Sequence, residues 1–263
     1  MIDVIPADCF KDCKQLESIH GIGKVRNVGP GAFRNCFELK DISFLSDILT
    51  GDAGCFRGCI GIKRAEFSQL KTISVSMFMG CLQLEQISFP ELDQVDNYAF
   101  YGCKNLCSVP VERITKRIGT GAFWNCNKLN KVTFSDTLRD IQPSAFRGCS
   151  SVRQIIFPET ILVIHAAAFR NAKSLSSITI CASDIRIRKS AFRDCSCLET
   201  VSVKSDSLRI EMTAFKGCSN LYYFDFSGIA TVHPTAFDDT PIQHGIQDDK
   251  RITWMQLSEQ AST

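Results

Sequence analysis

Residues 145–155, with the sequence AFRGCSSVRQI, are the stretch that decides the fold, because this pattern returns every 22 or 23 residues along the chain. A period in this range is typical of a solenoid, in which one small structural unit stacks on the next. We number the units as coils 1 to 11, each anchored on one phenylalanine: Phe10, Phe33, Phe56, Phe78, Phe100, Phe123, Phe146, Phe169, Phe192, Phe215 and Phe237.

The residues after each Phe predict a tight turn. Every coil has Gly, Asn or Asp two residues after the Phe, and these types tolerate positive φ, so each Phe segment is expected to end there. Nine coils have Cys three residues after the Phe, and ten have an aliphatic residue six after it. This spacing predicts a step of about three residues, closer to a 3₁₀ turn than to an α-helix.

The pattern then changes to strict alternation, which is typical of a half-buried strand. Positions nine and eleven after the Phe are apolar in pairs such as Ile155/Phe157, Ile42/Phe44 and Val132/Phe134, and the residues between them are mostly polar. A further apolar pair, such as Ile161/Ile164, should point inward from the return side of each coil. Successive coils should therefore align these strands in parallel, about 4.8 Å apart, with Phe stacked on Phe.

The string Ala-Phe-x-x-Cys-x-x-Leu-x-x-Ile, present from Ala145 to Ile155 with Val152 at the Leu position, resembles the BspA-like leucine-rich repeat. The resemblance extends from about Ile5 to about Gln243. It implies an α/β fold, a curved right-handed leucine-rich-repeat solenoid with a parallel β-sheet on the concave face and short helical turns on the convex side. It also implies adhesion or protein–protein contact at a cell surface, with no catalytic residues shared by the family.

The repeat predicts one solenoid domain over residues 1–243, followed by a C-terminal cap or tail over residues 244–263. The paired glycines at 29–31 and 119–121 are expected to loosen the repeat locally. Five apolar residues are available to cover the last coil: Ile246, Ile252, Trp254, Met255 and Leu257.

Composition and charge exclude several function classes. Thirty basic and 28 acidic residues give a net charge of +2, which leaves no electrostatic footprint for nucleic acid. No run approaches the length of a transmembrane span. Residues 1–4 lack the basic start and apolar stretch of a signal peptide, and the many thiols favour a reducing, cytoplasmic interior. The family resemblance implies the cell surface or secretion instead, and both compartments stay open.

The 14 cysteines are interpreted as free thiols. Nine occupy the column three residues after the Phe, where Ala172 replaces Cys in coil 8, so this position suits a small buried apolar side chain. Disulfides between neighbouring coils remain a geometric alternative. Close pairs such as Cys9/Cys13 are weak zinc candidates because no CxxC motif is present, and no metal or cofactor is expected.

The sequence offers no catalytic constellation. Its four histidines, His20, His165, His233 and His244, lie in no metal-binding helix, and no nucleophile elbow, phosphate loop or dinucleotide fingerprint is found. We therefore expect that the protein is not an enzyme.

Two surfaces are candidate partner-binding sites. The turn edge, formed by the residue after each Phe, includes a basic ladder and an apolar strip. The strand face is formed by positions eight and ten after each Phe. The candidates on the turn edge are the basic ladder, formed by Arg147, Arg170, Arg193 and Lys216, and the apolar strip, formed by Met79, Tyr101 and Trp124. Those on the strand face are Lys131, Thr133, Gln154, Ile156, Thr200 and Tyr223. The alternatives are a basic column neutralised by acidic neighbours and a strand face that is merely solvated.

The most favoured function is a protein–protein interaction or scaffold module without catalysis. A cell-surface adhesin that binds a host protein or a glycan is the second hypothesis, and a structural spacer in a larger assembly is the third. Glycan-array binding would favour the adhesin, and co-purification with one defined protein would favour the interaction module.

Overall fold

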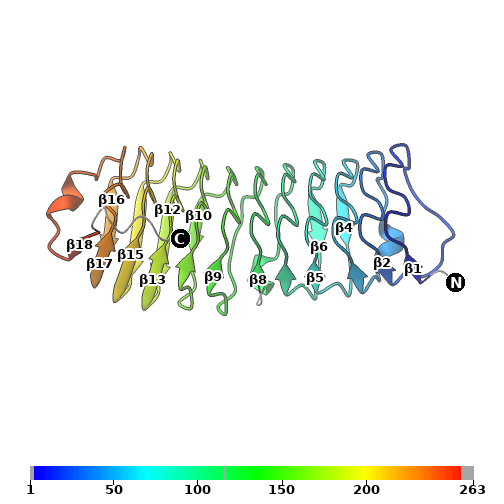
Figure 1. The fold of residues 1–263 in the computed structure, drawn as a ribbon, viewed down its shortest axis with the longest axis horizontal. Coiled ribbons are helices and arrows are strands. Elements are labelled where there is room, and N and C mark those ends of the chain that lie inside the picture. The colour runs from blue at the N-terminus through cyan, green and yellow to red at the C-terminus, as the bar shows by residue number, and fades with distance from the viewer. Residues whose placement is uncertain (1–2, 115–116, 256–263) are drawn as a thin grey trace.

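The computed structural model describes residues 3–114 and 117–255, and they form a parallel β-solenoid of about eleven turns. Figure 1 shows the coils side by side along the long axis, from coil 1 at the blue end to coil 11 at the red end. Helix is nearly absent, since the described residues contain only three short 3₁₀ helices: η1 (Ser43–Leu45), η2 (Val111–Arg113) and η3 (Gly245–Asp248).

The predicted strands of the strand face form in six coils and pair in parallel. They are β4 (Arg64–Glu66), β6 (Gln86–Ser88), β10 (Gln154–Ile156), β12 (Ser177–Cys181), β14 (Thr200–Lys204) and β16 (Tyr223–Phe226). Equivalent positions are in register, so Ile155 pairs with Ile178, Ile178 with Val201, and Val201 with Phe224. This alignment confirms the predicted stacking of identical coils.

The return side of the coils carries more strands than the strand face. The return strands form sheets of three, three and six: β1 (Val4–Ile5), β2 (Asn27–Val28) and β3 (Thr50–Gly51); β5 (Thr72–Ile73), β7 (Gln94–Val95) and β8 (Arg117–Ile118); and β9 (Asp140–Ile141), β11 (Val163–Ile164), β13 (Asp184–Ile187), β15 (Ser207–Ile210), β17 (Ile229–Val232) and β18 (Ile252–Trp254). The second residue of each apolar return pair, such as Ile164 of Ile161/Ile164, is therefore part of a strand, which the sequence pattern alone did not predict.

The strand-face sheet is interrupted, so the strands predicted at Ile42/Phe44 and Val132/Phe134 are wrong. The first segment overlaps the 3₁₀ helix η1. Between β6 and β10, the only strand pairing on this face among the described residues is an isolated bridge from Ser108 in coil 5 to Lys131 in coil 6. Pro110 accounts for the end of the pairing between β6 and coil 5, because a residue in its register would donate its N–H to the Ile87 carbonyl oxygen of coil 4 and proline has no N–H to give.

The Phe column is the centre of the hydrophobic core. Successive rings are stacked with centroids 5.2 to 5.6 Å apart, from the Phe10–Phe33 pair to the Phe215–Phe237 pair. All eleven are buried except Phe10, which has a stacking partner on one side only. The predicted stack is confirmed, and each ring shields its neighbours from water.

The Phe segments are hydrogen-bonded turns and not the expected short helical turns. Alternate N–H groups serve different partners: Arg147 N donates within the turn to Ser144 O (3.1 Å), whereas Phe146 N donates to Ala168 O of the next coil (2.8 Å). Because every second N–H group of the segment donates to the next coil, the continuous hydrogen bonds of a helix cannot form. The predicted positive φ two residues after the Phe occurs in all eleven coils.

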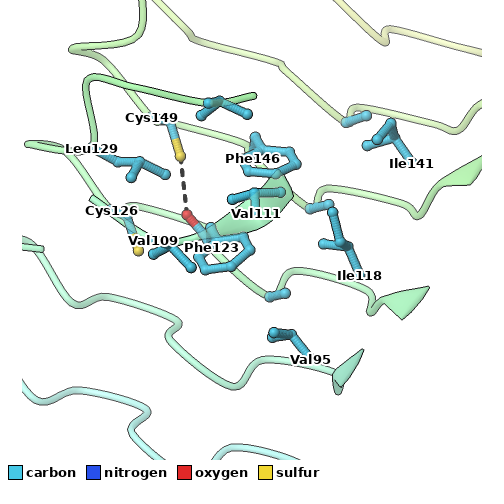
Figure 2. Packing of buried hydrophobic residues seen from close by; sticks show 14 of the residues in the cluster. Val95, Val109, Val111, Ile118, Phe123, Cys126, Leu129, Ile141, Phe146 and Cys149 are labelled. Atoms are coloured by element: carbon cyan, nitrogen blue, oxygen red, sulfur yellow. Dashed lines mark hydrogen bonds between the residues drawn. The ribbon is translucent and has the colours of Figure 1, made fainter. Parts of the chain in front are cut away.

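The column thiols satisfy backbone groups inside the core. Figure 2 shows Cys149 in coil 7 donating its S–H to the carbonyl oxygen of Phe123 in coil 6, at 3.1 Å. Seven further column cysteines donate in the same way to the preceding coil: Cys36, Cys59, Cys81, Cys103, Cys126, Cys195 and Cys218. In coil 8 the replacement Ala172 leaves Phe146 O without such a thiol. Cys13 in coil 1 is exposed, which corrects its assignment to the core.

The paired glycines are close-packing positions, which corrects the expectation that they loosen the repeat. Gly31 and Gly121 adopt φ near +60°, where a side chain is strained. Gly29 and Gly119 lie against the backbone of the preceding coil. A Cβ on Gly119 would lie 2.5 Å from Asn97 N and 2.6 Å from the Asp96 carbonyl carbon.

We predict that Gly119→Ala destabilises the protein by about 1–3 kcal/mol, because the two backbones must move apart to admit the methyl group. Urea unfolding followed by circular dichroism measures the loss. Gly245→Ala is the matched control, since a Cβ there meets no atom within 4 Å. Equal stability of the two variants would contradict the close approach of coils 5 and 6.

After coil 11 the chain crosses the end of the stack. The 3₁₀ helix η3 precedes β18, which adds a strand to the return sheet beside β17. Ile246 is buried, and Ile252, Trp254 and Met255 are half-buried. Leu257, the fifth residue expected to cover this end, lies outside the described residues.

Candidate functional site

The turn edge holds its side chains in a fixed row. The N–H of each Phe and of the residue two after it donate to the next coil at 2.7 to 3.1 Å in coils 1 to 9, so the residue between them is presented at the same place in each turn. The structure therefore places the turn-edge candidates side by side along the solenoid, as the repeat predicted.

The apolar strip on the turn edge is an aromatic cluster. The rings of Tyr101 and Trp124 meet edge to face with centroids 5.2 Å apart, and the Arg147 guanidinium lies 4.5 Å from the Trp124 ring centroid. This cation–π contact keeps the Arg147 charge at the surface beside the rings. Tyr98 extends the cluster, 6.2 Å from Tyr101.

Tyr98 was missed because it occupies the position two before the Phe, where residue types vary. That position also has positive φ in ten coils, in residues as different as Tyr98, Ala167 and Thr213. The only available signal was that glycine stands there in three coils, at Gly31, Gly54 and Gly121.

The basic ladder is largely compensated by acidic side chains. Arg170 and Arg193 both contact the Asp194 carboxylate, at 3.5 and 3.4 Å. Lys216 lies 3.5 Å from both Asp238 and Asp239. Surface pairs of this kind add little stability, but they reduce the charge that a partner would meet. Arg147 differs from the other three, since its contact is with an aromatic ring.

The strand-face candidates fall into two groups. Gln154, Thr200 and Tyr223 lie in one row across β10, β14 and β16, with Ser177 of β12 between the first two. Lys131 and Thr133 lie in the interrupted region, where the Thr133 hydroxyl donates to the Glu112 carboxylate at 3.1 Å. Ile156, two residues after Gln154 in β10, is 62% exposed, and Tyr223 in β16 is 55% exposed. Apolar surface therefore faces the solvent at both ends of this sheet.

Hollows open where the strand-face sheet is interrupted. One of about 360 Å³ lies over coils 4 to 6, and its lining includes Pro110, Glu112 and Lys131. A second, of about 560 Å³, shares Lys131 with it and extends to Ile156. Where the strands are not paired, this part of the strand face is therefore hollowed, in contrast to the continuous sheet.

The thiols and histidines do not combine into a reactive site. Burial raises the pKa of Cys36 to about 11 and raises those of Cys55, Cys81 and Cys126 further, so these thiols stay protonated and unreactive at neutral pH. Burial also lowers the pKa of His165. Within the described ranges, no three His, Cys, Asp or Glu side chains are placed to hold a metal ion.

The pair most similar to catalytic geometry is Ser18 with His20, whose Oγ and Nε2 atoms lie 2.9 Å apart. The nearby Asp41 carboxylate accepts a hydrogen bond from the Ser43 N–H at 2.8 Å. His20 and Asp41 are exposed on the first two coils, where water competes for every contact. In the part of the chain with described coordinates, no helix is long and apolar enough to cross a membrane.

Comparisons with known proteins agree with this architecture. The profile of a family described as "BspA type Leucine rich repeat region" matches residues 1–107 and 116–243 in six copies. No curated protein matches the chain. A leucine-rich cell surface protein from Faecalibacterium prausnitzii has a similar structure, with 21% identity, a TM-score of 0.50, and coverage of 86% of this chain and 77% of that chain. At this identity the likeness shows the fold alone.

Two further solved structures are more distant. A leucine-rich repeat protein from Bacteroides ovatus has 16% identity and a TM-score of 0.48, over 96% of this chain and 87% of that chain. A leucine-rich repeat protein from T. pallidum has 21% identity and a TM-score of 0.46, over 66% of this chain and 72% of that chain.

Proposed function

Because this chain belongs to the BspA-type leucine-rich repeat family, we propose that it is a non-catalytic module that binds a partner protein through its strand face and its turn edge. The coils wind right-handed in this proposal, with the strand face concave and the turn edge on the convex side, as the family resemblance implies. Residues 1–243 form the binding solenoid, and the segment from residue 244 caps it, which the pairing of β18 with β17 supports.

The observation that carries the proposal is the cluster of Tyr98, Tyr101, Trp124 and Arg147. Aromatic and Arg side chains are the types that most often dominate the free energy of protein binding. These four side chains are held in place by contacts with each other, and their backbone is held by the hydrogen bonds between coils. Little side-chain entropy would therefore be lost on binding. The compensated residues Arg170, Arg193 and Lys216 would surround this centre as a polar rim.

We expect the variant Tyr101→Ala/Trp124→Ala/Arg147→Ala to lose at least about tenfold in affinity for the partner protein, because it removes the central contacts. The partner is identified by affinity purification from the source organism, and its Kd is then measured by biolayer interferometry. Gln154→Ala/Thr200→Ala/Tyr223→Ala tests the strand face in the same assay.

Arg139→Ala/Arg186→Ala/Arg209→Ala is the matched control. These three arginines are exposed on the return side, and their side chains form no ion pair among the described residues. Unchanged affinity in both test variants, or equal losses in all three, would reject the proposal. Binding to a glycan array that depends on Tyr223 would favour an adhesin instead.

A further inference from the structure

Coils 5 to 8 carry a concentration of basic residues beside the strand face. The positions four to eight after the Phe in these coils are residues 104–108, 127–131, 150–154 and 173–177. They include five basic residues and no acidic one: Lys104, Lys128, Lys131, Arg153 and Lys173. We call these five residues the basic band. The same positions in the adjoining coils 4 and 9 contain Glu85 and Glu199, so acidic residues flank this run of four coils on both sides.

The side chains of the basic band form no ion pair among the described residues, although Glu112 and Asp136 line hollows beside Lys131. All five side chains belong to exposed residues. No carboxylate among the described residues lies within ion-pair distance of any of them, in contrast to the sharing of Asp194 by Arg170 and Arg193 on the turn edge. Like charges on adjacent coils raise the local positive potential and attract an anionic partner over about a Debye length, or 8–10 Å.

Two residues of the basic band line a hollow of about 540 Å³. Lys128 and Arg153 line it together with the polar groups of Asn130, Ser151 and Ser174. Asn130 and Arg153 also line the neighbouring hollow of about 560 Å³, whose other lining residues include Val132, Phe157 and Ile156. A basic hollow and a partly apolar one therefore lie next to each other, with two lining residues in common.

The interrupted sheet adds free backbone groups to this surface. Ser176 N donates to Arg153 O, and Phe157 N donates to Thr179 O, so the backbone groups of residues 153, 155 and 157 face β12. The N–H groups of Gln154 and Ile156 consequently face coil 6. Among the described residues no backbone hydrogen bond joins them to residues 131–133. Backbone donors of this kind can bind an extended chain or a carboxylate.

We propose that the basic band binds an extended acidic segment of the partner protein, with one apolar side chain of that segment in the hollow beside Ile156. Carboxylates of the segment pair with Lys128, Lys131 and Arg153. The apolar hollow favours a peptide over a sulfated polysaccharide, because a polysaccharide has no apolar side chain to bury there. This inference rests on the proposed function and specifies the chemistry of the partner.

The test uses a fluorescein-labelled synthetic peptide of glutamates interrupted by two leucines, and follows its anisotropy at low and at physiological ionic strength. We expect saturable binding that weakens with salt. Lys128→Glu/Lys131→Glu/Arg153→Glu should bind the peptide at least about tenfold more weakly, because attraction becomes repulsion. A peptide with glycine in place of leucine should also bind more weakly.

Arg139→Glu/Arg186→Glu/Arg209→Glu changes the net charge equally on the return side and should bind the leucine peptide as the unmodified protein does. Thermal unfolding checks that both variants are folded. Absence of binding, equal loss in the control, equal affinity for the glycine peptide, or preference for dextran sulfate over the peptide would each overturn the inference. Binding of the natural partner through the turn edge would survive such a result, so the two proposals fail separately.

Discussion

Raising the pH from about 8 to about 10 is expected to destabilise this protein strongly, because its core contains many thiols whose ionisation the folded state opposes. Besides Cys36, burial raises the pKa of seven thiols well above their ordinary value of 9.0: Cys55, Cys59, Cys81, Cys103, Cys126, Cys149 and Cys195. For Cys55, Cys59, Cys81, Cys126 and Cys195, neighbouring cysteines add to the effect of burial.

The direction follows from proton binding. Above pH 9 the unfolded chain releases thiol protons that the folded chain retains, so the free energy of unfolding decreases as the pH rises. Each retained proton contributes about 1.4 kcal/mol per pH unit, and seven contribute on the order of 10 kcal/mol by pH 10. This equals the whole stability of a typical domain. Urea unfolding at a series of alkaline pH values, with reductant present, measures the slope.

The matched variant is Cys103→Ala/Cys126→Ala/Cys149→Ala, which repeats the substitution that the chain itself has at Ala172. It should be less stable at neutral pH, because three S–H···O bonds to Phe carbonyls are lost. Its stability should nevertheless fall less steeply above pH 9, by about 4 kcal/mol per pH unit. An unchanged slope would show that the thiol column is not the cause.

Truncation of one ring in the middle of the Phe column should be the most damaging single substitution. Phe146 is stacked on Phe123 and Phe169, with both centroid distances at 5.2 Å, and it makes a T-shaped contact with Phe134 at a centroid distance of 5.7 Å. We expect Phe146→Ala to lower the free energy of unfolding by about 3–5 kcal/mol, because the resulting cavity lies between two stacked rings that cannot move together to fill it. Chemical denaturation with urea measures this loss.

Phe10→Ala is the control for the Phe column. Phe10 has the same 5.2 Å stacking contact, but with Phe33 only, and its other side is partly exposed. Its truncation should cost clearly less than that of Phe146, since part of its surface is already in water. If both variants lost the same stability, shielding by neighbours on both sides would not be the source of core stability.

The sequence predicted the candidate surfaces better than the contacts within them. The turn edge was predicted as a row, and Tyr101, Trp124 and Arg147 do lie together. The pairing of Arg170 and Arg193 with one carboxylate was only an alternative, because it depends on side-chain conformations across two coils. The basic band was missed because its five residues are scattered over four repeats and fall within no single sequence motif.

The amino-acid sequence by itself determined the repeat, the inward columns and the turns. The position of Phe146 needs a stacking ring in every coil, and that of Gly148 needs a residue that tolerates positive φ. The residue types at these positions therefore recur with the period. Only the tertiary structure decided where the sheet breaks and which charges remain unpaired. Those features depend on a single residue of the neighbouring coil. Pro110, for example, leaves the Ile87 carbonyl oxygen without an N–H donor. A contact that occurs between only two coils does not repeat with the period, so the repeat pattern does not reveal it.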